Sequence, residues 1–141
     1  MNTVVQALTE EEKQQCFDLR LEVFVDEQGF SADIELDEYD ATASHYLLKQ
    51  NNGVVGVGRF ILKENYGKIG RLAIKKSQRG KGLGKLLLLE IEKQNLERVK
   101  DFLLHAQSDK REFYENCGYV VEGDEFLEEG VPHLKMRKVY L

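Results

Sequence analysis

Three glycines and several basic residues form the part of this sequence with the clearest potential for chemistry. Gly80, Gly82 and Gly84 alternate with basic and apolar residues just before a stretch with helical periodicity. Glycine lacks a Cβ atom, so the backbone can adopt positive φ and bring successive N–H groups close to an anion. The first N–H groups of the following helix have no intrahelical partner and add to this positive potential. The spacing therefore predicts a phosphate-binding loop.

Two common glycine motifs do not match this loop. A Walker loop needs four residues between its first glycine and Gly-Lys-Ser/Thr, whereas three residues separate Gly80 from Gly84, and Leu86 replaces the hydroxyl residue. A dinucleotide fingerprint needs its third glycine one residue later than Gly84. What remains is Arg79-x-x-Gly82-x-Gly84, between a strand-like run and a helix-like run.

This pattern resembles the Q/R-x-x-G-x-G/A signature of the GNAT superfamily, the acyl-CoA-dependent N-acyltransferases. The segment SDKREFYENCGY, at 108–119, is similar to a later signature of that family, and the stretches LRLEVFVDEQG and EFLEEGVPHLKMRK are similar to its small ElaA/YjcF-like branch. The resemblance covers nearly the whole chain. It implies that coenzyme A is bound through its pyrophosphate by the backbone amides of Arg79, Gly80, Lys81, Gly82, Leu83, Gly84 and Lys85.

Length and composition limit the possible folds and cellular compartments. The chain has 141 residues, of which 42% are apolar and 32% are charged, as in an ordinary globular protein, and it is predicted to be one domain, 1–141. Cys16 and Cys117 are its two cysteines, with no spacing typical of a metal or redox site, so a reduced cytoplasm is the simplest setting. Acids near the N-terminus and short apolar runs argue against a signal peptide or membrane span.

The distribution of charge is more informative than the net charge of −5. The range 75–85 holds five basic residues and no acids, whereas 26–40 holds seven acids and no basic residues. A basic loop suits an anionic cofactor, and the overall acidity argues against nucleic acid as a partner. The acidic run either attracts a cationic acceptor or is ordinary solvated surface.

The periodicity predicts a helical element early in the chain and another after the glycine loop. Thr9 and Glu12 match a capping box, and the helix that follows carries Phe17, Leu21 and Phe24 on one face, together with Arg20. A second helix begins near Leu83 and is expected to end near Lys100. Ser108 is expected to cap a short third helix, which Gly118 ends in a left-handed conformation.

Strands are predicted around the two longer helices. A hairpin is expected over 45–49 and 54–62, with Asn51-Asn52-Gly53 as its turn, followed by strands over 68–74 and 102–106 and a last strand containing Leu134 and Met136. The order is helix, hairpin, strand, helix, strand, helix, strand, with a crossover around the glycine loop. This indicates an α/β fold with a mixed α+β sheet. The resemblance implies the GNAT arrangement, a central mixed sheet flanked by helices, with a further short helix within 28–40.

The resemblance also implies roles for two further parts of the chain. In the family, the backbone of the strand before the loop, here Leu72, Ala73 and Ile74, pairs with the acyl carbonyl and the pantetheine amides. Tyr114 stands where the family has a tyrosine that donates a proton to the departing thiolate of coenzyme A. A phenol with an ordinary pKa near 10 is a suitable donor to an alkyl thiolate. From the residues alone, these positions also fit a plain core strand and a packing aromatic.

The general base is the open point of the mechanism. Many family members use a glutamate on the strand before the loop, but this chain has Arg71 there, which stays protonated and cannot be the base. The candidates are Glu27, Glu35 and Asp37 in the acidic run and His105 on the strand after the crossover. Glu35 and His105 are taken as the working assignments, although His105, like His133, also fits a structural histidine.

Arg20, Arg59 and Arg71 each lie on an element that is otherwise apolar, and an unpaired buried guanidinium is costly. They either pair with Glu27, Glu35 or Asp37 as a structural network, or one of them binds a carboxylate or phosphate of the acceptor. Cys117 has no basic neighbour that would activate it for an acyl-cysteine route, so it is interpreted as a small buried hydrophobe.

The resemblance as a whole implies an acetyl-CoA-dependent N-acetyltransferase that acts by direct transfer in a ternary complex. Its partners would be acetyl-CoA and an amine-bearing acceptor, with no metal, nucleic acid or membrane, and the sequence allows a homodimer. An acyl-CoA-binding module with the same fold and little catalysis is the alternative, since the usual glutamate is missing.

Overall fold

The structure is a computed structural model that describes residues 1–32, 37–51 and 53–141. Within these ranges, seven strands form one sheet in the order β1-β2-β3-β4-β5-β7-β6. All neighbouring strands are antiparallel except β4 (Gly67–Ile74) and β5 (Asp101–Gln107), which are parallel. The mixed sheet confirms the predicted fold class. The other strands are β1 (Asn2–Gln6), β2 (Ser44–Gln50), β3 (Gly53–Leu62), β6 (Val120–Glu128) and β7 (Val131–Val139).

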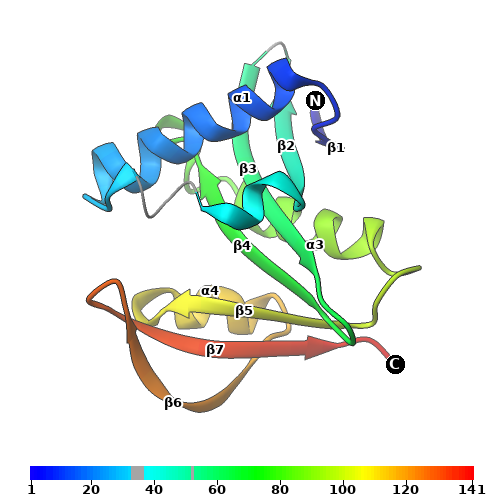
Figure 1. The fold of residues 1–141 in the computed structure, drawn as a ribbon, viewed down its shortest axis with the longest axis vertical. Coiled ribbons are helices and arrows are strands. Elements are labelled where there is room, and N and C mark those ends of the chain that lie inside the picture. The colour runs from blue at the N-terminus through cyan, green and yellow to red at the C-terminus, as the bar shows by residue number, and fades with distance from the viewer. Residues whose placement is uncertain (33–36, 52) are drawn as a thin grey trace.

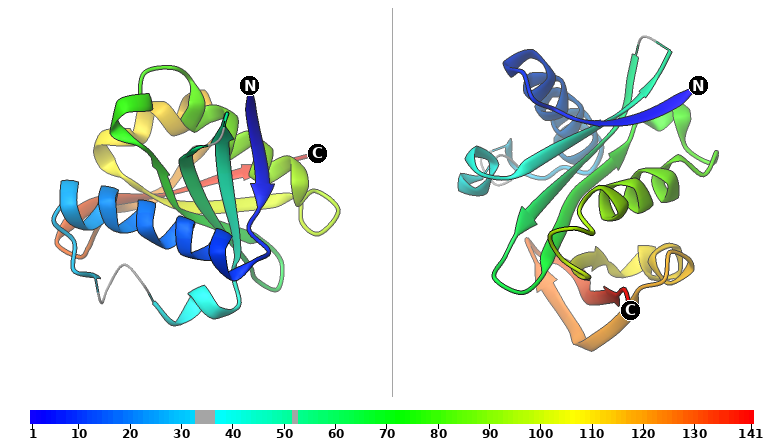
Figure 2. Two further views of the ribbon diagram at one scale, coloured as in Figure 1. Left: turned by 90° about the horizontal axis from the view of Figure 1, so that it is seen from above. Right: turned by 90° about the vertical axis from the view of Figure 1, so that its right-hand side faces the viewer.

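Helices cover both faces of the sheet (Figures 1 and 2). On one face lies α1 (Glu10–Arg20), which continues as the π-helix η1 (Leu21–Glu27), and on the other lies α3 (Leu83–Gln94). The short helix α4 (Arg111–Asn116) packs Phe113 and Tyr114 onto the core on the α3 side. Three 3-10 turns complete the described elements: η2 (Glu38–Ala41), η3 (Lys76–Gln78) and η4 (Ser108–Lys110).

The capping box predicted at the start of α1 is confirmed. Thr9 Oγ1 accepts a hydrogen bond from the Glu12 amide at 3.1 Å, and the Glu12 carboxylate accepts one from the Thr9 amide at 3.2 Å. The most buried face of the helical segment runs through Cys16, Leu19, Arg20 and Val23. The predicted Phe17 and Phe24 pack at the edges of this face, and burial of Arg20 follows the prediction.

Two ends of helices differ from the prediction. α3 ends at Gln94 instead of near Lys100. The Asn95 side chain ends the helix by donating one hydrogen bond to Ile91 O at 2.7 Å and another to Tyr46 Oη at 3.1 Å. Ser108 does not cap α4. Its hydroxyl donates to the Glu125 carboxylate at 2.7 Å, and α4 begins without a side-chain cap.

Two strands were absent from the predicted order. β1 precedes the first helix and forms the edge beside β2, and β6 forms the other edge beside β7. Both are largely exposed and rich in polar residues, so neither has the apolar alternation that marks a half-buried strand. The hairpin turn is as expected at Asn51, which has φ of 57°, and the second residue of the turn, Asn52, lies outside the described residues.

Gly67 lies where β4 and β5 pair, and a Gly67→Ala substitution tests how tightly this end of the sheet is packed. An added Cβ atom would lie 2.2 Å and 2.6 Å from two ring atoms of Phe60, a side chain that is 1% exposed. Because a buried ring has little room to move, we expect unfolding in urea to show a loss of about 1–3 kcal/mol. At Gly53 the nearest atom would lie at 3.8 Å. Gly53→Ala is therefore the control, with an expected change within about 0.5 kcal/mol, and equal effects at the two sites would contradict the packing argument.

Candidate active site

β4 and β5 begin together and then separate. Their pairing is confined to two residue pairs, Gly67 with Phe102 and Lys68 with Leu103, and the strands diverge from there toward their carboxyl ends (Figure 1). Beyond Lys68, no described strand pairs with β4 on its β5 side. The backbone of Leu72–Ile74 therefore presents a strand edge that no strand covers, although Ile74 O accepts a hydrogen bond from Arg79 Nε. Between the two strands lies a cleft of ≈ 980 Å³, also lined by the glycine loop, α4, η1 and the tip of the β6–β7 hairpin.

A bulge in β4 accompanies this separation. The register between β3 and β4 shifts after Val57, and Arg71 adopts a left-handed backbone with φ of 52°. Such a conformation costs a residue with a side chain about 1–2 kcal/mol, and it directs the chain away from a regular ladder. Arg71 Nη2 donates to Asp37 Oδ2 at 3.1 Å. The position that sequence reasoning matched to the family glutamate is thus a strained bulge at the cleft.

The glycine loop presents unpaired amides at the cleft. Gly80 and Gly82 have φ of 79° and 76°, and nothing lies within 4 Å of where their Cβ atoms would be. α3 begins directly afterwards, at Leu83. Within the described residues, no hydrogen-bond acceptor takes the amides of Gly80, Lys81, Gly82, Leu83, Gly84 or Lys85. Six neighbouring donors at a helix N-terminus are suited to a pyrophosphate group.

Arg79 secures the loop to the rest of the fold. Its guanidinium makes two hydrogen bonds of 2.8 Å to the Glu27 carboxylate, and its Nε donates to Ile74 O at 2.9 Å. Its amide points to Lys76 O at 3.4 Å, so it is less available than the six amides that follow. The hydrogen bonds from Arg79 also lower the pKa of Glu27. A carboxylate held in this way is a poor proton acceptor, so the geometry disfavours Glu27 as the base.

Tyr114 lines the cleft from α4. Its ring contacts Phe113 and Tyr119 edge to face, with centroid distances of 5.0 Å and 6.2 Å. Its hydroxyl makes no hydrogen bond with any described residue, and burial raises its pKa to about 12. The phenol therefore stays protonated at neutral pH with its proton uncommitted. Burial also raises the pKa of Cys117, which keeps that thiol protonated and favours the interpretation of Cys117 as a core residue.

His105 belongs to a cluster on the other side of the cleft. Its Nδ1–H donates to Glu128 Oε1 at 2.9 Å, since a carboxylate can only accept, and His133 Nε2 lies 3.6 Å from Glu128 Oε2. The ring of Phe126 contacts both imidazoles. The hydrogen bond from His105 lowers the pKa of Glu128. This arrangement leaves Nε2 of His105 without a hydrogen-bond partner among the described residues.

The comparisons with known proteins agree with this geometry. A family model described as an acetyltransferase (GNAT) domain matches residues 5–140. The chain is similar to YjcF, an uncharacterised N-acetyltransferase of Bacillus subtilis, with 38% identity over 94% of this chain and 96% of the relative. This chain belongs to the GNAT acetyltransferase family. It is therefore an acyltransferase that uses an acyl-CoA and an acceptor.

Solved GNAT structures share the fold over the whole chain. A Lactobacillus plantarum protein assigned to the N-acetyltransferases has 28% identity and a TM-score of 0.93, with 99% of each chain covered. Escherichia coli ElaA, at 24% identity, has a TM-score of 0.88 and covers 98% of this chain and 99% of its own. Together with YjcF, these relatives confirm the ElaA/YjcF-like branch of the GNAT superfamily.

The predicted site residues of this GNAT protein converge on one cleft. Tyr114, His105 and the backbone of Leu72–Ile74 all line it, as do Gly80, Gly82, Leu83 and Gly84 of the loop. Glu35 lies outside the described residues, so its assignment as a base stays a prediction. Sequence reasoning missed Glu128, the partner of His105. A Glu-Glu-Gly turn between two apolar stretches was the available signal, but its contact with His105 depends on pairing across three strands.

The buried arginines form a network with two aspartates of η2 and its cap. Arg20 pairs with Asp40 at 2.7 Å, and Arg59 pairs with Asp37 at 2.7 Å and with Asp40 at 3.1 Å. Sequence reasoning named Asp37 as a partner but missed Asp40. Burial alone would raise the pKa of Asp40, but the hydrogen bonds and charges of Arg20 and Arg59 outweigh it and hold the pKa below its usual value.

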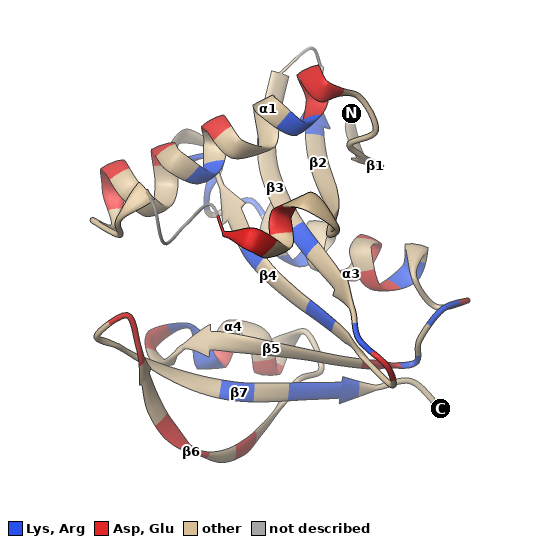
Figure 3. Ribbon diagram, in the orientation of Figure 1, with Lys and Arg blue, Asp and Glu red and all other residues tan. Residues whose placement is uncertain are grey.

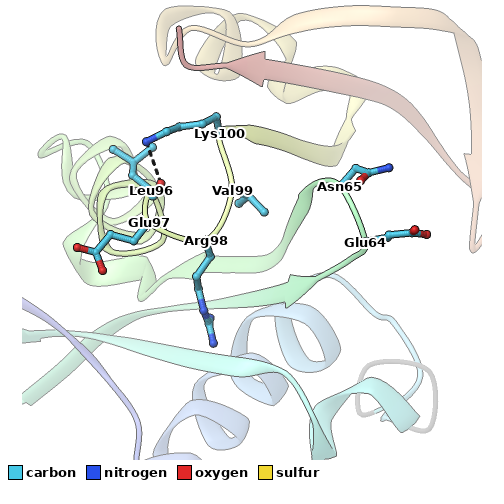
Figure 4. A pocket seen from close by; sticks show the side chains of 7 residues that line it. All are labelled: Glu64, Asn65, Leu96, Glu97, Arg98, Val99 and Lys100. Atoms are coloured by element: carbon cyan, nitrogen blue, oxygen red, sulfur yellow. Dashed lines mark hydrogen bonds between the residues drawn. The ribbon is translucent and has the colours of Figure 1, made fainter.

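A second hollow, shown in Figure 4, lies outside the cleft. It has a volume of ≈ 320 Å³ and is lined by the β3–β4 turn and the α3–β5 connection. Its two basic side chains are held locally: Lys100 Nζ donates to Leu96 O at 2.9 Å, and Arg98 Nη1 to Asn95 Oδ1 at 3.1 Å. None of the predicted site residues lines it, so the cleft is the candidate active site. Among the described residues, no helix is long and apolar enough to cross a membrane, and no cluster could hold a metal ion.

An Asp40→Asn substitution tests the arginine network. Two guanidiniums would lose a buried charged partner, so we expect a loss of about 3 kcal/mol in unfolding free energy at pH 7. Because the pKa of Asp40 is lower in the folded state, its contribution is fully present above the unfolded pKa near 4 and fades as the pH falls through the folded value. The difference between wild type and variant should therefore shrink below about pH 4. Asp18→Asn, at an exposed helix position, is the control, and a difference that is constant with pH would contradict the argument.

Proposed function

We propose that this protein is an acetyl-CoA-dependent N-acetyltransferase that moves the acetyl group to a primary amine by direct transfer in a ternary complex. The observation that carries the proposal is the loop of six unpaired amides at the mouth of a cleft that also holds Tyr114 and an open strand edge. Residues 1–141 act as one domain. The proposal takes the protein to be cytoplasmic, which its two free, buried cysteines suit, and it holds for a monomer or a homodimer.

Three parts of the chain divide the binding of acetyl-CoA. The amides from Gly80 to Lys85 hold the pyrophosphate, and Arg79 keeps the loop in place through Glu27. The open edge of Leu72–Ile74 pairs with the pantetheine amides and the thioester carbonyl, as a strand would pair with its neighbour. Gly84 allows close approach of α3 to α4, since a Cβ atom there would lie 3.1 Å from the Phe113 ring. These contacts place the thioester near Tyr114.

His105 removes a proton from the acceptor ammonium at its Nε2, while Glu128 holds the opposite nitrogen. The neutral nitrogen forms a bond to the thioester carbonyl carbon, and the nitrogen cation that results loses its second proton to solvent as the carbon–sulfur bond breaks. The thiolate takes the proton of the Tyr114 hydroxyl. Tyr114 then regains a proton from solvent and His105 releases its proton to solvent, so one proton is released for each amide formed. Glu35 is the alternative base in this proposal. Positioning the two reactants in one cleft supplies a large part of the rate.

A glycine pair with matched backbone geometry tests the pyrophosphate loop. Gly82 and Gly123 have φ of 76° and 79°, and neither has an atom within 4 Å of a Cβ position. A Gly→Glu substitution therefore introduces similar backbone strain at each site. We expect calorimetric titration to show that Gly82→Glu weakens acetyl-CoA binding at least about 100-fold by placing a carboxylate at the amides.

Gly123→Glu, in β6 outside the cleft, should bind as wild type does. Circular dichroism and thermal unfolding of both variants control for the fold. Equal binding by the two variants would contradict the loop assignment, and no binding by wild type would overturn the acetyl-CoA proposal.

Tyr114→Phe tests the proton donor. The variant keeps the ring contacts and removes only the hydroxyl, so we expect kcat to fall about 10²-fold or more with little change in the KM for acetyl-CoA. The assay follows amine-dependent release of the free thiol. Because the pKa of Tyr114 is about 12, the phenol stays protonated from pH 7 to 10, and the ratio of wild-type to variant kcat should be constant over that range.

Tyr66→Phe, at a tyrosine that does not line the cleft, is the control and should leave kcat unchanged. A Tyr114→Phe variant with wild-type kcat would show that another group protonates the thiolate. Acetyl-CoA binding with no thiol release for any amine would favour the binding module over the enzyme.

A further inference from the structure

Two cations in the cleft have donors that no described residue satisfies. Arg59 is 5% exposed and makes both of its ion pairs through Nη1. Its Nε is buried without a hydrogen-bond partner, and no described residue accepts from its Nη2. Lys68 lines the same cleft, and its ammonium forms neither a hydrogen bond nor an ion pair with the described residues. Among the described residues, Arg59 Nε is the buried donor without an acceptor, and such a donor is rare in folded proteins. Lys68 is only half-buried, so its ammonium is open to the cleft.

Strand register places these two cations on the same face of the sheet as His105. Lys68 pairs with Ile61 of β3, and Arg59 lies two residues from Ile61, so both side chains leave the sheet on one side. Lys68 also pairs with Leu103 of β5, and His105 lies two residues further along that strand. Standard strand spacings put the Cα atoms of Lys68 and His105 roughly 8 Å apart. A small molecule can therefore reach the cations and His105 at once.

The carboxylates around this part of the cleft are already engaged. The two oxygens of Glu128 face His105 and His133. Those of Asp37 accept from Arg59, Arg71 and the Tyr39 amide. Glu128 attracts the Lys68 ammonium but forms no ion pair with it, and Glu129 also lines the cleft. The donors at Arg59 Nη2 and Lys68 Nζ therefore have no hydrogen-bonded acceptor among the described residues.

We propose that the acceptor amine carries a carboxylate, which binds between Lys68 Nζ and Nη2 of Arg59 while the amine lies toward His105. The proposal rests on the proposed acyltransferase function and specifies its acceptor as a small amino acid. One carboxylate oxygen can accept from Nη2 of Arg59 and the other from the Lys68 ammonium, so the ligand makes a charge-assisted hydrogen bond to each cation. The acetyl group is then transferred to the amine of this amino acid, and the carboxylate is unchanged.

The electrostatics of Lys68 agree with an anionic ligand. Burial lowers the pKa of Lys68, Glu128 opposes this shift, and the neighbouring charges of Arg59, Lys63 and Arg71 lower the pKa further. An ammonium in such surroundings is destabilised by desolvation and by like charges. A carboxylate bound beside it offsets both effects by direct attraction, so binding of an anion is favoured over binding of a neutral group.

Pairs of amino acids and their amides test the acceptor class. The panel contains glycine, L-alanine, L-leucine and L-phenylalanine, each with its carboxamide, and thiol release is measured at saturating acetyl-CoA. We expect kcat/KM for the preferred acid to exceed that for its amide by about 10-fold or more. The amide has the more easily deprotonated amine, so basicity alone would produce the opposite order.

Substitution of Lys68 assigns the preference to the proposed contact. Lys68→Met should lower the acid-to-amide ratio of kcat/KM about 10-fold while the KM for acetyl-CoA and the rate with amides stay unchanged. Lys68→Arg retains the charge and should retain much of the preference. Lys93→Met, on the exposed side of α3, makes the same change in net charge and should leave the ratio unaltered.

A binding measurement separates this inference from the proposed function. The N-acetylated acids and their amides are titrated calorimetrically into the protein with coenzyme A present, which requires no turnover. If the acids bind more tightly than the amides and Lys68→Met loses this difference, the carboxylate site is supported. This holds even if no amine releases thiol, because the absence of thiol release would contradict only the enzyme proposal. Turnover without an acid preference, or with a preference that Lys68→Met leaves intact, overturns the inference and leaves the acyltransferase. If the protein shows no turnover and no selective binding, both proposals are overturned.

Discussion

The short pairing between β4 and β5 is the constraint on which the rest of the site depends. These strands share two residue pairs and then separate, which creates an edge of backbone donors and acceptors inside the protein. Unpaired backbone groups in a protein interior are costly unless a ligand or water satisfies them. The geometry of the split in the sheet is therefore suited to an extended molecule with amide groups. The opening lies at the carboxyl ends of β4 and β5, because the strands diverge in that direction. This is also the end of parallel strands at which open sheets bind their ligands.

The crossover connection places the anion-binding loop at the same end. The glycine loop follows β4 directly and α3 begins at Leu83, so the N-terminus of the helix has to lie beside the carboxyl end of the strand. Its free amides and dipole then face the mouth of the cleft, and α4 brings Tyr114 to the facing wall. One topological feature thus sets the positions of the glycine loop, the open strand edge and Tyr114.

Much of this arrangement could be predicted from the sequence because it is encoded locally. The glycine spacing, the Thr9–Glu12 capping box and the apolar runs of the central strands each depend on residues that are close in the chain. The edge strands β1 and β6 were missed because edge strands need little apolar burial. The predicted end of α3 was wrong because Asn95 stops the helix through a contact with Tyr46, which is 49 residues away in the chain. Glu128 was missed for a similar reason, since only the pairing of β5, β7 and β6 brings it to His105.

The charges near the cleft show how Arg71 is accommodated at the bulge of β4. In Figure 3, basic residues colour β4, and acidic residues colour both η2 in front of it and the tip of the β6–β7 hairpin. Arg71 is held at its bulge by Asp37, which also pairs with Arg59. A glutamate at this position would repel Asp37 and leave Arg59 with less compensation. On the other wall of the cleft, Glu128 accepts a hydrogen bond from one imidazole nitrogen of His105. The acidic partner of His105 and the cations of β3 and β4 therefore lie on different strands of the split sheet, so a molecule in the cleft meets a hydrogen-bonded imidazole on one wall and cationic side chains on the other.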